Sequence, residues 1–148
     1  DDSGNSNSVA RGRFCFAPAG QPQYCWLALQ QGTPINYPVV QGTDNSYYLT
    51  HLYDGTYNAN GCLFLDCRVN RDFSSLHSII YGHYMRSGAM FASLAGYKDQ
   101  AYYDEHPTLM LMTPDENYTV ALFAGYVASV DDPAWRWYSL MPLHLKHG

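Results

Sequence analysis

Short runs rich in β-branched and aromatic residues, each ended by a turn signal, constrain the fold of this chain more than any other feature. The runs are YCWLAL, INYPVV, CLFLDC, HSIIYGH, TLMLMT and YTVALFAGYVASV. Segments with Gly, Pro, Asn or Asp, such as QQGTP and PDEN, separate them. β-Branched and aromatic residues favour strands, and these turn residues favour tight reversals. The pattern predicts about six strands in a mainly β fold, a mostly antiparallel sheet or barrel.

Helical signals interrupt the strands in two places. The segment GAMFASLAGY places Met90, Phe91, Leu94 and Tyr97 at helical spacing, and Gly96 is suited to end that helix. A shorter helix is expected to start under the capping side chain of Asp44 or Asn45. PDEN between the last two runs predicts a hairpin, and Pro38 predicts an edge or a bulge in the second strand.

The chain has the length of one domain. Its 148 residues divide into a polar leader over residues 1–13, which cannot offset the entropy of ordering, and a single domain over residues 14–148. The net charge is −5 with only eight Lys and Arg, so no basic surface for nucleic acid is expected. No run reaches the roughly 18 apolar residues that a membrane-spanning helix needs.

Four cysteines, Cys15, Cys25, Cys62 and Cys67, permit three disulfide pairings, and their spacing does not choose among them. None has zinc-finger spacing, so neither a structural metal nor another cofactor is expected. Cys62 and Cys67 are five residues apart, and in a regular strand they would face opposite sides. Since cysteine often packs as a small hydrophobe, a packing role is expected for both rather than a catalytic one.

His83 is the principal candidate for chemistry. It follows Gly82, whose missing side chain suits a sharp exit from a strand or a close approach by another segment. An imidazole titrates near neutral pH and can act as an acid or a base, although a core histidine at a strand end is the simpler alternative. His77, six residues earlier, would share its strand face and form a metal pair without a third ligand. Asp66 ends an apolar strand and either orients an imidazole or faces water.

Four segments occur in an order and spacing that resembles the class B sortases, the cysteine transpeptidases of Gram-positive cell surfaces. They are GTPINYPVVQGTDNSYYL, GCLFLDCRVNRDF, SIIYGHYMRSGAMFASLAGYKD and YTVALFAGYVAS. The match runs from about Trp26 to about Trp135, and YGH-x-M followed by MF-x-x-L is its most specific part.

The resemblance implies a sortase-like β-barrel with short helical insertions, at the outer face of the cell membrane and membrane-anchored in its full-length form. In that family the histidine of the YGH segment, here His83, works with a cysteine and an arginine. The cysteine attacks the Thr–Gly bond of an NPxTx-like sorting signal, and an amine of the cell wall or a pilin resolves the thioacyl intermediate. The DN-x-YYL segment lines the substrate groove, which implies contacts from Asn45 and Leu49.

The resemblance also implies residues that this sequence does not contain. The family places its catalytic cysteine in a TLxTC-like strand well after Val127 and its arginine on the next strand. No cysteine follows Cys67, and Arg136 lies too early to take the arginine's role. We therefore expect a barrel that is incomplete at the C-terminus and a chain without activity. A truncated or frame-altered product and a natural noncatalytic relative that only binds peptide are both open.

An incomplete barrel predicts self-association. Missing strands would leave unpaired backbone edges, and such edges recruit other strands. Size-exclusion chromatography with light scattering is expected to show species larger than a monomer, or a protein of marginal stability. A stable monomer at high concentration would contradict this prediction.

Overall fold

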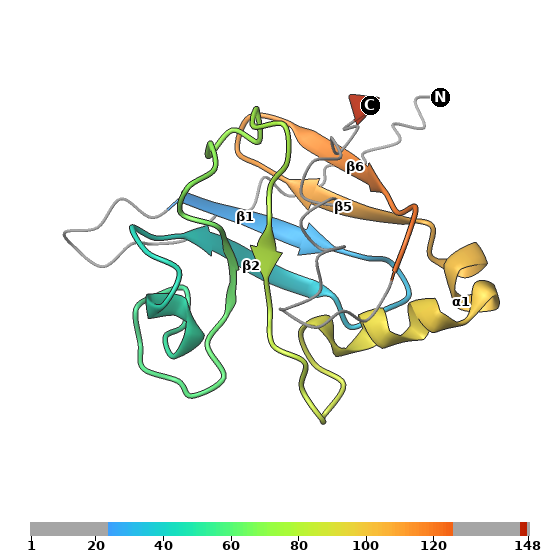
Figure 1. The fold of residues 1–148 in the computed structure, drawn as a ribbon, viewed down its shortest axis with the longest axis horizontal. Helices are drawn as coiled ribbons and strands as arrows, with labels where there is room; N and C mark the ends of the chain where they lie inside the picture. The colour runs from blue at the N-terminus through green and yellow to red at the C-terminus, as the bar shows by residue number, and fades with distance from the viewer. Residues whose placement is uncertain (1–23, 126–145, 148) are drawn as a thin grey trace, which may run out of the picture.

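The computed structural model describes residues 24–125 together with residues 146 and 147 (Figure 1). The leader expected over residues 1–13 and Arg136 lie outside the described residues, as does the end of the last predicted β run.

One sheet of seven strands organises the described residues. Its order is β4-β3-β2-β1-β5-β6-β7. The strands are β1 (Tyr24–Leu29), β2 (Asn36–Gln41), β3 (Leu63–Leu65), β4 (Ile80–Tyr81), β5 (Thr108–Met112), β6 (Asn117–Ala121) and β7 (Lys146–His147). Neighbours are antiparallel except β2 and β3, which run parallel. The mainly β prediction is confirmed.

The sheet curls over one of its faces. In Figure 1, β4 crosses in front of β1 and β2 at a steep angle. Ile80 of β4 lines a cavity together with Leu109 and Leu111 of β5, although three strands separate β4 from β5 in the sheet order. The described strands therefore form a half-barrel, with β4 at one edge and β7 at the other.

Alternating side chains of β2 and β3 divide the core between the two faces of the sheet. Val39 pairs with Leu63 and Val40 with Phe64. The larger cluster contains Trp26, Ala28, Ile35, Val39, Leu63, Leu65, Phe73, Leu111 and Tyr118. The smaller cluster contains Val40, Tyr48, Cys62 and Phe64. Because successive side chains of a strand point to opposite faces, each one-residue step along β2 and β3 moves from one cluster to the other.

The short helices lie where the sequence predicted them, but two of them are 3-10 helices rather than α-helices. The 3-10 helix η1 (Tyr47–Leu49) starts after Asp44, whose Oδ1 accepts hydrogen bonds from the N–H of Ser46 and of Tyr47 at 2.7 and 2.8 Å. The helix predicted near residues 88–97 is a 3-10 helix, η2 (Phe91–Lys98), followed by α1 (Gln100–Glu105). Gly96 lies inside η2 and does not end it, because Asp99 separates η2 from α1 and caps α1.

Two predicted strands are shorter than their apolar runs. The run around residues 77–83 forms a strand only at Ile80–Tyr81, because β4 has β3 as its single neighbour among the described strands. His77 therefore does not share a strand face with His83, which corrects the prediction. The run around residues 62–67 forms a strand only at Leu63–Leu65.

The hairpin prediction is confirmed, and the prediction of an edge or a bulge at Pro38 is wrong. β5 and β6 form the predicted hairpin, closed by the Thr113 N–H donating to the Glu116 carbonyl at 2.9 Å. Pro38 lies in β2 opposite Leu27, inside the sheet rather than at its edge. β3 pairs with β2 only at Val39 and Val40. Pro38 therefore has no neighbouring strand on the β3 side, and its missing N–H costs no hydrogen bond there.

The side chains of Leu63 and Phe91 approach the backbone of Gly82 closely, as the position of this glycine after the strand predicts. A Cβ on Gly82 would overlap the Leu63 side chain and come within 2.6 Å of Phe91 Cδ2. We expect Gly82→Ala to lower the free energy of unfolding by about 1–3 kcal/mol, because overpacking forces its neighbours aside. Urea denaturation measures this loss. The exposed Ser87→Ala is the control, and equal stability of the two variants would contradict the prediction.

Candidate functional site

A small open pocket lies at the end of β4, against the smaller hydrophobic cluster. Its volume is about 140 Å³. It is lined by Leu49, Cys62, Phe64, Tyr81, Gly82 and His83. Leu49 comes from η1, Phe64 from β3, and His83 from the segment that follows β4. The structure thus brings together two residues that the sequence singled out, Leu49 and His83, from segments 34 positions apart.

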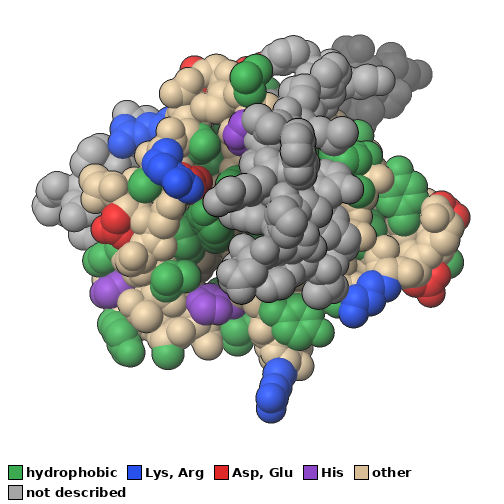
Figure 2. All heavy atoms as spheres, in the orientation of Figure 1, with side chains coloured by type: hydrophobic (Ala, Val, Ile, Leu, Met, Phe, Trp, Pro, Cys, Tyr) green, Lys and Arg blue, Asp and Glu red, His purple; other side chains and the backbone are tan. Residues whose placement is uncertain are grey.

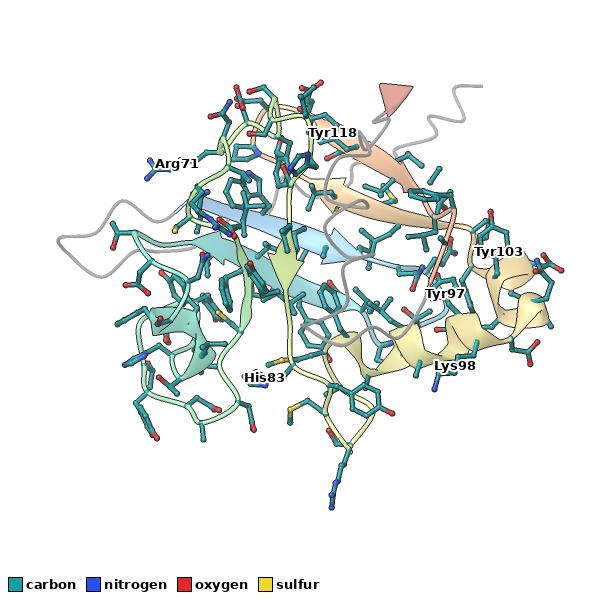
Figure 3. All side chains as sticks on the ribbon, in the orientation of Figure 1. Arg71, His83, Tyr97, Lys98, Tyr103 and Tyr118 are labelled. Carbon is teal, nitrogen blue, oxygen red and sulfur yellow. The ribbon has the colours of Figure 1, made fainter. Side chains whose placement is uncertain are left out.

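His83 is half-buried at the rim of this pocket, between β4 and the loop that carries η1 (Figure 3). Its Nε2 lies 3.3 Å from the carbonyl oxygen of Leu49. A carbonyl can only accept, so this contact requires the hydrogen on Nε2 and leaves the Nδ1 lone pair of a neutral imidazole free to take a proton. The Phe91 N–H donates to the His83 carbonyl at 3.3 Å and fixes the backbone behind the ring.

Cys62 lines the same pocket but has the wrong protonation state for a nucleophile. The residue is 6% exposed, and its thiol is not in a disulfide. Burial, with a smaller contribution from the charge of Asp54, raises the pKa of Cys62 to about 12. No hydrogen bond among the described residues joins this thiol to His83. The thiol therefore stays protonated at neutral pH, in agreement with the expected packing role.

Asn45 contacts the strand ends rather than the pocket. Its Oδ1 accepts from the Cys67 N–H at 2.8 Å, and its Nδ2 donates to Asp66 Oδ2 at 3.0 Å. Asn45 is not among the residues that line the His83 pocket. Cys67 is also unpaired and lies outside the pocket, on the loop after β3.

Asp66 neither faces water nor contacts an imidazole in the structure. It is 1% exposed, and Arg68 binds it through Nε at 2.9 Å and Nη2 at 2.6 Å. Tyr81 donates its hydroxyl to Asp66 Oδ2 at 2.9 Å. These bonds, led by those from Arg68, hold the pKa of Asp66 well below its usual range. Tyr81 is the site residue that sequence reasoning missed, and neither role considered for Asp66 included its bond to Tyr81, since nothing in the spacing pairs the two residues.

His77 lies in a different place from His83. It lines a separate cavity of about 570 Å³ with Asp66, Arg68 and Leu76, and its Nδ1 is buried without a hydrogen-bond partner. Within residues 24–125, 146 and 147, no group of three or more His, Cys, Asp or Glu side chains is placed to hold a metal ion.

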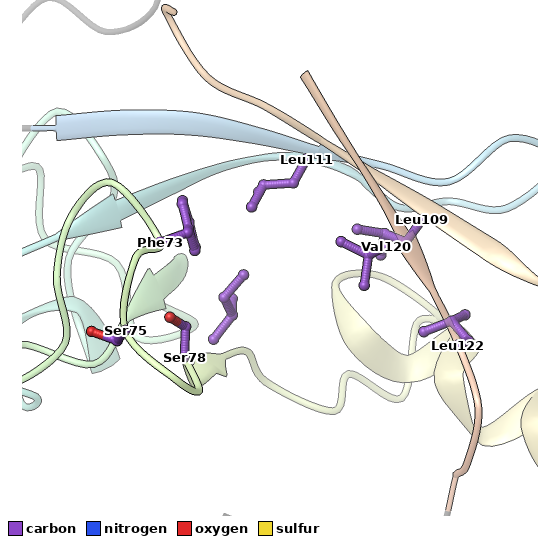
Figure 4. Close-up of a pocket in the computed structure, with 8 residues that line it drawn as sticks. Phe73, Ser75, Ser78, Leu109, Leu111, Val120 and Leu122 are labelled. Atoms are coloured by element: carbon purple, nitrogen blue, oxygen red, sulfur yellow. The ribbon is translucent and has the colours of Figure 1, made fainter. Parts of the chain in front are cut away.

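An apolar cavity of about 180 Å³ occupies the inner face of the curled sheet (Figure 4). Its lining consists of Phe73, Ser75, Ser78, Ile80, Leu109, Leu111, Val120 and Leu122. None of these side chains is an acid, a base or a thiol, so the candidate chemistry lies in the smaller pocket beside His83.

Comparison with known proteins identifies the family. Sortase B of Listeria monocytogenes is 40% identical over 106 residues, and sortase B of Staphylococcus aureus is 30% identical over 107 residues. Each alignment covers 72% of this chain and 43% of the relative, so the chain spans less than half the length of these proteins. No family model matches the chain.

Solved structures give the same result. The Staphylococcus aureus sortase B–substrate complex superimposes with a TM-score of 0.71 at 27% identity, over 74% of this chain and 51% of that one. A sortase B complexed with triglycine gives a TM-score of 0.67 at 28% identity, over 70% and 48%. Over this shared region, the chain belongs to the class B sortase family. The resemblance inferred from the sequence is confirmed, and so is the sortase fold.

His83 and Cys62 line the same pocket of this class B sortase homologue. The protonation state of the Cys62 thiol can be tested by alkylation. A pKa of about 12 in place of the ordinary 9.0 leaves roughly a thousandfold less thiolate at a given pH below 9. We expect iodoacetamide at about pH 8 to modify Cys62 at least about a hundredfold more slowly in the folded chain than in urea. Peptide mapping by mass spectrometry measures both rates at the same residue. Equal rates in the two states would show that the thiol is neither buried nor protonated.

Proposed function

We propose that this chain forms part of a cysteine transpeptidase that cleaves an NPxTx-like sorting signal and joins the protein to a cell-wall or pilin amine. The observation that carries the proposal is the meeting of Leu49 and His83 in one open pocket at the end of β4. The family neighbours support both partners, since one is a sortase B–substrate complex and another is sortase B complexed with triglycine.

His83 is proposed as the acid/base of the reaction. Its Nε2 contact with the Leu49 carbonyl orients the ring, and Nδ1 is the nitrogen that exchanges a proton with the reacting groups. The ring is half-buried beside an open cavity, so a peptide can reach it. An imidazole held within reach of the reacting groups can act as a general acid or base without a metal or another cofactor.

Leu49 and Asn45 are proposed to contact the sorting signal. Leu49 is 43% exposed although it lines the pocket, so a peptide side chain can cover its remaining apolar surface. Asn45 uses one amide hydrogen on Asp66 and retains a second one, which can donate to a peptide carbonyl.

We propose that the 148-residue chain binds the signal without cleaving it. The thiol of Cys62 stays protonated, Cys67 lies outside the pocket, and no cysteine follows Cys67 in the sequence. Loss of one member of a catalytic unit costs nearly as much as loss of all of them. The same facts favour the alternative function, a noncatalytic sortase-like module that holds a peptide in this groove.

The proposed setting is the surface of a Gram-positive bacterium, with the full-length protein anchored to the membrane. Among the described helices, none has the length and apolarity to cross a bilayer. Self-association is proposed through β4, which pairs with β3 alone among the described strands. The face in Figure 2 shows few Lys and Arg side chains and no basic band across it, so no nucleic-acid partner is proposed.

Peptide binding and turnover test this function separately. A fluorescein-labelled peptide containing Asn-Pro-Ala-Thr is titrated with the chain and followed by fluorescence anisotropy. We expect Leu49→Ala to weaken binding roughly fivefold. The alanine offers less apolar surface for the peptide to bury, about half of what a fully buried leucine side chain would contribute. A fluorogenic version of the peptide should not be cleaved, and intact-mass spectrometry should show no thioacyl adduct.

Leu76→Ala is the matched control, since Leu76 is also an exposed leucine but lines a different cavity. Its affinity should equal that of the unchanged chain. Cleavage that is lost on alkylation or in Cys62→Ala would overturn the assignment of Cys62 as a packing residue. Absence of any peptide binding would overturn the proposed function.

A further inference from the structure

The His83 pocket has two walls that come from separate segments of the chain. One wall is Leu49, at the end of η1, and the other is the segment from Tyr81 to His83 after β4. The direct contact between the two walls is the 3.3 Å approach of His83 Nε2 to the Leu49 carbonyl. A single bond of this length does not fix two loops, so something else must hold the walls at their separation.

Asp66 bonds to Tyr81 of one wall and to Asn45, which precedes Leu49 of the other wall by four residues. On one side its Oδ2 accepts from Asn45 Nδ2 at 3.0 Å, and the Asn45 Oδ1 accepts from the Cys67 N–H at 2.8 Å. Asn45 follows Asp44, whose carboxylate accepts from the N–H of Tyr47, the first residue of η1. These two bonds join the segment before η1 to the end of β3, and they add to the Cys62 N–H bond to the Tyr48 carbonyl at 3.1 Å.

The second connection from Asp66 is to Tyr81. The Tyr81 hydroxyl donates to the same Oδ2 at 2.9 Å, and its ring stacks on Phe64 with centroids 5.0 Å apart. Tyr81 lines the pocket and precedes His83 by two residues. Its hydroxyl bond and its ring contact together fix the backbone that carries the imidazole.

Arg68 makes this arrangement rigid. Its Nε and Nη2 bind the two carboxylate oxygens of Asp66, and its N–H also donates to Oδ1 at 2.9 Å. A buried carboxylate with charged and neutral donors on both oxygens has one orientation that satisfies them all. The Asp66 side chain is 1% exposed, whereas that of Arg68 is 74% exposed and covers the carboxylate from the solvent side.

We infer that Asp66 is a positioning residue that sets the separation of Leu49 and His83, through Asn45 on one wall and Tyr81 on the other. Its role in recognition of a peptide rests on the proposed function of the pocket. Its role in holding the two walls does not. Asp66 has no contact with the imidazole, so it does not act as the partner that orients or charges His83.

Tyr81→Phe isolates one connection without removing the buried carboxylate. NOE contacts between the His83 ring protons and Leu49 report the separation of the walls with no ligand present. We expect these contacts to weaken in Tyr81→Phe and in Asn45→Ala. Peptide affinity should fall roughly three- to tenfold in each, the range that one hydrogen bond supplies.

Tyr118→Phe is the matched control, because Tyr118 donates its hydroxyl to another carboxylate, that of Glu116, far along the sheet. It should leave the NOE contacts and the affinity unchanged. In an Asp66→Ala background, Tyr81→Phe should have little further effect, since the acceptor of the Tyr81 hydroxyl is already removed.

The outcomes separate the two proposals. Unchanged NOE contacts in folded Tyr81→Phe and Asn45→Ala would overturn the positioning role, whatever the peptide does. Weakened NOE contacts with no peptide binding by the unchanged chain would support the positioning role and overturn the proposed function. If Asp66→Ala does not fold, the two single variants and the control still decide the question.

Discussion

The parallel pairing of β2 with β3 is the constraint on which the rest of the structure depends. Its register sets Val39 beside Leu63 and Val40 beside Phe64, and alternation then assigns these residues to opposite faces. One face builds the large core with Trp26. The other face builds a small cluster that becomes the floor of the His83 pocket. A slip of one residue would exchange the faces and remove both.

Burial raises the pKa of both Cys62 and Asp66, but hydrogen bonds outweigh it at Asp66. Asp66 remains charged because Arg68 and Tyr81 donate to it, and the favourable hydrogen bonds exceed the cost of removing a carboxylate from water. Cys62 has no such donors, so burial, with a smaller contribution from the charge of Asp54, keeps its thiol protonated. The site therefore combines a charged, hydrogen-bonded carboxylate, a protonated thiol and a half-buried imidazole. Among the described residues, this pocket holds no thiol that is ionised at neutral pH.

Local features were predictable where neighbouring residues decide the structure. The hairpin of β5 and β6 follows from two β runs around PDEN, and the start of η1 follows from the capping carboxylate of Asp44. The extent of the strand at β4 was not predictable, because pairing partners rather than the apolar run around Ile80 limit it. Gly96 was misassigned for a similar reason, since Asp99 ends one helical segment and begins the next.

The sequence by itself determined the strand-rich fold, the sortase family and the candidacy of His83, because turn chemistry, two-residue alternation and motif order are all local in the chain. Only the tertiary structure decided which residues meet. Asp66 bonds to Asn45 across 21 positions and to Tyr81 across 15, and Leu49 reaches His83 across 34. These contacts depend on the register and curl of the sheet, which no spacing in the sequence specifies.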